Sequence, residues 1–92
     1  MTTNFIGRSL TANEIEQNVE LNMAFINLIV NDSINIVTLS FDIASASAAN
    51  NLMVLKAGES RTNIAVPFTK LYYKADVNTS AMRIEGLAKA EF

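Results

Sequence analysis

The stretch Val19–Phe25, which reads VELNMAF, decides the fold class, because its large apolar residues occupy alternate positions. A period of two predicts a β-strand with one buried and one wet face. The alternation breaks near Asn27, and Leu28–Val30 is continuously apolar. We therefore expect a β-bulge, or burial on both faces, at this point.

Similar short segments follow this strand along the chain, separated by residues that favour turns. Their spacing of roughly 8 to 12 residues is typical of a sandwich or barrel. The expected strands are residues 34–43, 52–56, 62–68, 70–75 and 82–87, with an Ala/Ser-rich loop at 44–51. We predict an all-β fold, a single small antiparallel β-sandwich of about six strands, over residues 18–92.

Residues 1–17 are expected to lie outside the sandwich. Thr11–Glu14 has the form of a helix capping box, but only Ile15 and Val19 follow on a helical face. A short helical turn and an extended N-terminal arm both remain open.

The composition indicates a single domain with surplus apolar surface. The chain has 92 residues and a net charge of −2, with 50% hydrophobic and only 17% charged residues. A chain of this size buries roughly 60 to 65% of its surface on folding. Two expected strands, Met23 to Val30 and Ile34 to Ile43, are apolar on both parities, so each needs cover on both faces. We expect a second copy of the chain to supply it, which predicts a homo-oligomer.

The missing residue types exclude several kinds of chemistry. The chain has no Cys and no His, which rules out thiolate or imidazole metal sites and Ser-His-Asp triads within one chain. No dense acidic loop of the kind that binds calcium is present. We therefore name no catalytic residue, metal ligand or cofactor, and we expect a protein that is not an enzyme.

Charge and hydropathy also limit the classes of partner that the chain is expected to have. Seven Lys and Arg are scattered along an acidic chain, whereas nucleic-acid binding needs a clustered basic surface. The first residues lack the pattern of a signal peptide, and the most apolar window, Met23–Val30, is too short to span a bilayer as a helix. We expect no nucleic-acid partner, no membrane and no export.

Three segments carry a resemblance to a known class of proteins. The sequences LKAGES (residues 55–60), VPFTKLYYK (66–74) and AMRIEG (81–86) resemble the turns and strand ends of small structural proteins of tailed bacteriophages. The similarity covers residues 25–87. It implies a head decoration protein, a head-fibre protein or a tail-associated subunit, which contacts other virion proteins of the capsid or tail. It also implies synthesis in the host bacterial cytoplasm, a final location in the virion, and an N-terminal arm that reaches a neighbour.

The candidate interface residues are the large apolar and aromatic side chains of the expected arm and of two strands: Phe5, Ile6, Leu10, Phe25, Tyr72 and Tyr73. Because successive residues of a strand face opposite ways, one tyrosine should face in and the other out.

The alternative interpretation is a ligand-binding module that recognises carbohydrate on a host surface. In that case Tyr72 or Tyr73 would stack on a sugar beside Asn63 or Asn78. Core and interface roles for the tyrosines are favoured, because neither a Trp nor a basic groove accompanies them.

Overall fold

The computed structural model describes residues 5–47 and 52–89, which form an all-β fold. The elements are β1 (Phe5–Ala12), β2 (Gln17–Asn31), β3 (Val37–Phe41), the 3-10 turn η1 (Ser45–Ser47), β4 (Met53–Leu55), β5 (Ser60–Ile64), β6 (Phe68–Ala75) and β7 (Ser80–Ala88). Every strand pairing is antiparallel. The predicted all-β antiparallel class is therefore confirmed.

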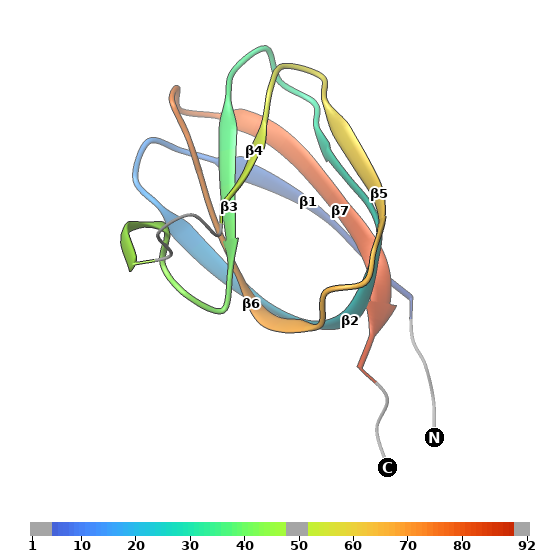
Figure 1. Ribbon diagram of the computed structural model, residues 1–92. Coiled ribbons are helices and arrows are strands. Elements are labelled where there is room, and N and C mark those ends of the chain that lie inside the picture. The colour runs from blue at the N-terminus through green and yellow to red at the C-terminus, as the bar shows by residue number, and fades with distance from the viewer. Residues whose placement is uncertain (1–4, 48–51, 90–92) are drawn as a thin grey trace.

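The strands form one curled sheet in the order β1-β7-β2-β6-β3-β4, with β5 also paired to β2. Strand β2 belongs to both layers of the curl (Figure 1). Its first residues pair with β6, and its last residues lie between β7 and β5. One layer therefore contains β6, β3 and β4, and the other contains β1, β7 and β5.

Two local features let the sheet turn this corner. Asn22 has a φ of 50° in the irregular part of β2 between Glu20 and Met23. Asn is among the few residues that tolerate this left-handed conformation. Beside it, the chain between β5 and β6 turns at Pro67, which has no N–H to donate to a ladder. Residues 65–67 belong to no strand, so the ladder on this side of β2 is interrupted at the corner, while the other side of β2 stays paired with β7.

The turns gather at one end of the molecule, which we name the loop end. Ala12 pairs with Ser80 and Gln17 with Tyr73 near this end. The β1–β2, β2–β3, β4–β5 and β6–β7 connections all lie there (Figure 1). The corner of the sheet and both ends of the described chain lie at the other end.

The core lies between the two layers. Both layers contribute fully buried side chains, among them Met23, Ile26, Ile29, Ile84, Leu39, Leu71 and Phe68. The rings of Phe41 and Phe68 are 4.9 Å apart and tilted, a favourable arrangement for aromatic pairs. Burying each large side chain stabilises the fold by about 1.5 to 3 kcal/mol.

The expected bulge near Asn27 is present. The register between β2 and β7 shifts between Ile26 and Leu28. Ile29 consequently faces the core, while Leu28 is half-buried on the opposite side.

The segment from Asn31 to β3 differs from the prediction. We expected a strand from residue 34, but residues 32–36 form a loop and β3 starts at Val37. The side chains of Asn31 and Ser33 hold the loop by accepting hydrogen bonds from the backbone N–H groups of Ser33 and Asn35. Further along, the described part of the expected 44–51 loop contains η1, and residues 48–51 lie outside the described residues.

The N-terminal segment joins the sheet. From Phe5 opposite Leu87 to Ala12 opposite Ser80, β1 pairs with β7 without a register shift. Residues 13–16 form the turn into β2, and the described residues of the expected arm contain no helical turn. Ile6 and Leu10 pack against the core, which determines the face of β1 that points inward.

Candidate interaction surface

A row of three apolar side chains crosses the outer face of β1, β7 and β2. Leu87 is the register partner of Phe5 on one side and of Phe25 on the other. Residues opposite each other in antiparallel strands point to the same face, with Cβ atoms about 4.5 to 5.5 Å apart. Phe5 is 61% exposed, and Phe25 and Leu87 are half-buried. Two aromatic rings therefore flank one leucine at the surface.

The apolar surface continues along β2. Leu28 pairs with Glu85 and Val30 with Arg83, and both apolar side chains are half-buried on this side. We name the set Phe5, Phe25, Leu28, Val30 and Leu87 the outer apolar face. The opposite side of the same strands is the core, so β2 is apolar on both sides, as the sequence indicates.

Gly86 fixes the position of Phe25 in this row. A Cβ at Gly86 would collide with the carbonyl oxygen of Phe25 and would lie 3.1 Å from Sδ of Met23. Only a glycine lets the bulged backbone of β2 approach β7 this closely. Packing therefore requires a glycine at the last position of the sequence RIEG.

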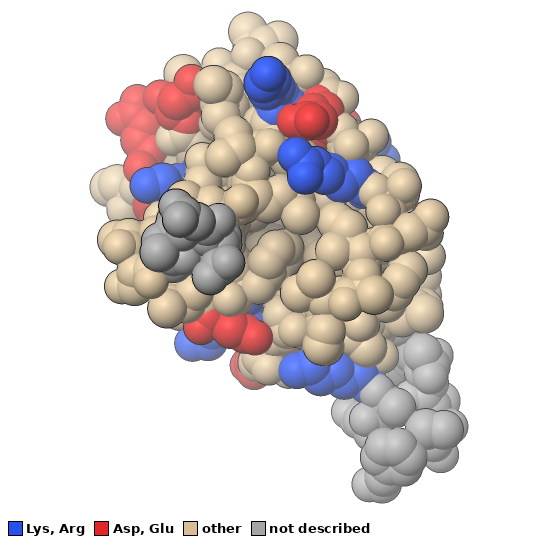
Figure 2. All heavy atoms as spheres, viewed as in Figure 1, with Lys and Arg blue, Asp and Glu red and all other residues tan. Residues whose placement is uncertain are grey.

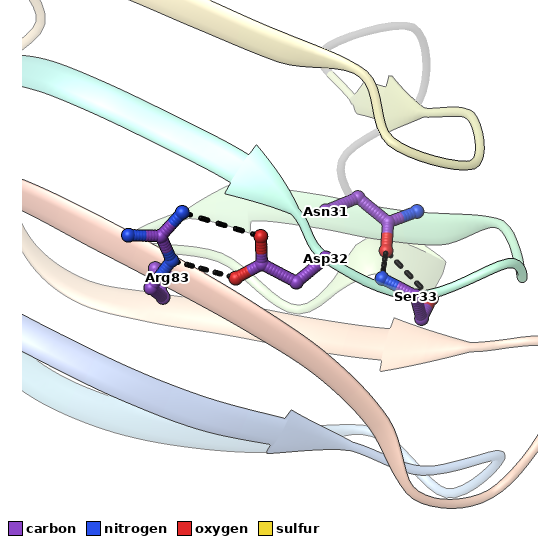
Figure 3. Close-up of polar contacts among 4 residues, drawn as sticks. All are labelled: Asn31, Asp32, Ser33 and Arg83. Carbon is purple, nitrogen blue, oxygen red and sulfur yellow. Dashed lines mark hydrogen bonds and ion pairs between the residues drawn. The ribbon is translucent and has the colours of Figure 1, made fainter.

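An ion pair marks the loop end of the outer apolar face (Figure 3). Nε and Nη2 of Arg83 donate to Oδ2 and Oδ1 of Asp32 at 2.7 and 3.3 Å. This hydrogen bonding holds the pKa of the Asp32 carboxyl below its ordinary value and raises the pKa of Arg83. The pair ties the residue after β2 to the middle of β7. Because both side chains are partly exposed, its main effect is on geometry.

Asn31, next to that pair, organises the β2–β3 loop from a fully buried position. Its Nδ2 donates to the carbonyl oxygens of Leu55 and Lys56, at 3.0 and 3.1 Å, and to that of Asn35. Its Oδ1 accepts from the backbone N and the Oγ of Ser33 (Figure 3). One amide thus connects the end of β2 to its own loop and to β4 of the other layer.

The structure divides the six predicted interface residues among three places. Phe5 and Phe25 lie on the outer apolar face, on opposite sides of Leu87. Ile6 and Leu10 lie on the other side of β1 and pack against the core. Tyr73 belongs to the core, and Tyr72 is half-buried on the outer side of the other layer.

The tyrosines face opposite ways, as their positions on one strand predict. Burial raises the pKa of Tyr73, while Tyr72 lies in register between Asn18 and Ser40. Asn63 lies on β5, in the other layer. Asn78 lies in the β6–β7 turn, where its Oδ1 accepts from the N–H of Glu14.

A second apolar surface lies at the loop end, on three neighbouring connections. Its exposed members are Ile15, Ile34, Ile36 and Val77. The β1–β2 turn is linked to the β6–β7 turn by Asn13, and the β2–β3 loop to the latter by Asp76. Sequence reasoning assigned Ile34 and Ile36 to a strand that needs cover on both faces, whereas they lie in the β2–β3 loop. The group of four was not predicted, because strand periodicity carries no information about turns.

Charged side chains are dispersed on the face seen in Figure 2. Lys and Arg form separate small groups there, with uncharged surface between them. Within residues 5–47 and 52–89, three or more metal-ligating side chains never come together in a potential metal site. The same described residues contain no helix that is long and apolar enough to cross a membrane.

Comparisons of this chain with protein-family models, with curated proteins and with solved structures gave no match.

Proposed function

We propose that this protein is a non-enzymatic structural subunit of a bacteriophage particle, which self-associates and docks on other virion proteins. The observation that carries the self-association is the outer apolar face. Its row of Phe5, Leu87 and Phe25 lies on strands whose other side already forms the core. The phage assignment rests on the resemblance of residues 25–87 to small virion proteins.

Covering the outer apolar face has a favourable free energy. Burial of a large apolar side chain is worth about 1.5 to 3 kcal/mol, and Phe5 is more than half exposed in the single chain. On β1 the polar side chains of this face, Ser9 and Thr11, are uncharged, so their burial costs less than that of charges. On β7 the face carries Arg83 and Glu85.

The charges on this face suit a second copy of the same chain. Arg83 and Glu85 are two residues apart on the outer side of β7. When two copies pack with their β7 strands antiparallel, Arg83 of each approaches Glu85 of the other. Such a contact is self-complementary about a two-fold axis, which is the usual symmetry of homodimers.

Sedimentation of two matched variants tests this contact. Phe5→Gln removes an exposed ring from the outer apolar face, and we expect the dissociation constant of the oligomer to rise about tenfold or more. Ile15→Gln is the control, because Ile15 is also a large, exposed apolar residue but lies at the loop end. A wild-type chain that stays monomeric at high micromolar concentration would contradict self-association. If only Ile15→Gln weakened the oligomer, the contact between copies would be assigned to the loop end instead.

The identity of the neighbouring genes tests the phage assignment separately. Capsid and portal genes beside this gene would favour the head, and tape-measure or baseplate genes would favour the tail. Neighbours unrelated to virion assembly would count against a virion role.

A further inference from the structure

Strand β1 is the long open edge of the sheet. It is the first strand of the sheet order, so one side pairs with β7 and no described strand pairs with the other. The other two strands that pair on one side only, β4 and β5, are three and five residues long. An open edge presents backbone N–H and C=O groups that can pair with another strand.

The usual protections of an edge are weak in β1. It contains no proline, and its pairing with β7 shows no bulge. Its one protection is its single charge, Arg8, which lies on the side of the core and donates from Nη1 to the carbonyl oxygen of Gly7 at 3.4 Å. Eight residues in regular register are enough for another strand to pair with. The edge is therefore suited to extend the sheet.

The alternation of β1 restricts which registers a second copy can adopt. Phe5, Gly7, Ser9 and Thr11 belong to the outer face, and Ile6, Arg8 and Leu10 to the side of the core. In an antiparallel pair about a two-fold axis, opposed residues must share a face. The axis must therefore pass through a residue, and the two central choices are Arg8 and Ser9.

Charge decides between these two registers. An axis at Arg8 places two guanidinium groups directly opposite each other, which is destabilising. An axis at Ser9 places Arg8 opposite the partner's Leu10, whose side chain the aliphatic stem of Arg8 can cover. It also places Ile6 opposite the partner's Ala12.

We propose that two copies join through antiparallel β1 strands with Ser9 on the two-fold axis, which makes one continuous sheet across the dimer. This inference rests on the proposed self-association and adds a contact separate from the outer apolar face. A two-fold axis perpendicular to the sheet keeps both outer faces on the same side. The joined pair therefore presents two outer apolar faces side by side.

Disulfide trapping tests the register, since the natural chain has no Cys. A Ser9→Cys variant places one thiol on the axis, opposite its own copy. Cβ atoms of opposed residues in antiparallel strands are about 4.5 to 5.5 Å apart, close to what a disulfide needs. Ser60→Cys, an exposed serine on β5, is the control. A mixture of Gly7→Cys and Ser9→Cys chains probes the competing register, which places residue 7 opposite residue 9 and leaves Arg8 in place.

Under mild oxidation we expect Cys at position 9 to cross-link at least about tenfold faster than Cys at position 60, because pairing raises the local thiol concentration. Hydrogen exchange of β1 amides should also slow as the concentration of wild-type protein rises. Equal cross-linking rates in an oligomeric wild type would overturn the edge pairing and leave the proposed self-association standing. Faster cross-linking between Cys at position 7 and Cys at position 9 than between two copies of Cys at position 9 would overturn the register. A wild type that is monomeric throughout would overturn both proposals.

Discussion

Gly86 lies directly against the carbonyl oxygen of Phe25, with no room between them for a Cβ atom. Because that oxygen belongs to the backbone of a bulged strand, it cannot move without breaking the ladder. We expect Gly86→Ala to lower the free energy of unfolding by about 3 kcal/mol, the upper part of the usual range for overpacking. Thermal denaturation measures the change. Gly7→Ala is the control, since a Cβ there would meet other atoms only at 4.0 Å. Equal effects of the two substitutions would contradict this account of Gly86.

Among the polar residues, we expect Asn31 to make a large contribution to the free energy of unfolding. Asn31→Leu removes the donor to three carbonyl oxygens and the acceptor for Ser33. Leaving a buried polar group unpaired costs about 1 to 3 kcal/mol, so we expect a loss of about 3 kcal/mol in urea denaturation. Asn27→Leu is the matched control, because Asn27 is exposed on the same strand. Stability that is insensitive to Asn31→Leu would show that these hydrogen bonds do not hold the loop.

The pH dependence of stability should reflect two carboxyls with lowered pKa values. Hydrogen bonds from Arg83 lower the pKa of Asp32, and those from the backbone N–H groups of Lys70 and Thr69 lower the pKa of Asp42. A lowered pKa in the folded state means that the stabilisation is complete above the unfolded value and is lost as the pH falls through the folded one. The melting temperature should therefore fall with acidification below the ordinary value of 3.8. Titration followed by NMR should show the Asp32 midpoint rising in Arg83→Gln, with Asp42 unchanged. An Asp32 midpoint that Arg83→Gln leaves in place would contradict the ion pair.

Thr79 has a backbone conformation that suits glycine better than a β-branched residue. Its φ is 60° in the β6–β7 turn, and such a conformation costs roughly 1 to 2 kcal/mol in a residue with a Cβ. We expect Thr79→Gly to raise the free energy of unfolding by about 1 kcal/mol. Gly58→Ala is the converse test, because Gly58 has a φ of 70° and a Cβ there would meet nothing within 4 Å. It should destabilise by a similar amount, through φ alone. Destabilisation by Thr79→Gly would show that the Thr79 hydroxyl, which donates to the carbonyl of Asn78, outweighs the strain.

Local periodicity predicts where the strands of this fold lie in the sequence better than it predicts which strands pair with each other. The break at Asn27 was visible as three consecutive apolar residues. The bend at Asn22 was hidden, because Leu21 and Met23 keep their parity through it and both face the core. The sequence pattern also does not identify β1 as a strand of the sheet. Arg8 interrupts the alternation of Ile6 and Leu10, and the strand that pairs with β1 is the last in the chain.

The outer apolar face could be predicted only in part. Apolar residues on both parities of Met23–Val30 indicated a second covered side for β2. The placement of Phe5 and Phe25 on either side of Leu87 depends on two strand registers, and the sequence alone specifies neither of them. Tyr72 and Tyr73 were correctly separated in direction, because that needs only their adjacency on one strand.

The passage of β2 through both layers bears on how the molecule unfolds. A sandwich whose layers share no strand can lose one layer while the other persists. Here β2 pairs with β6 in one layer and with β7 and β5 in the other, so detaching either layer breaks the ladder of the same strand. Unfolding should be a single cooperative transition, and the amides of β2 should exchange with solvent only when the whole molecule opens.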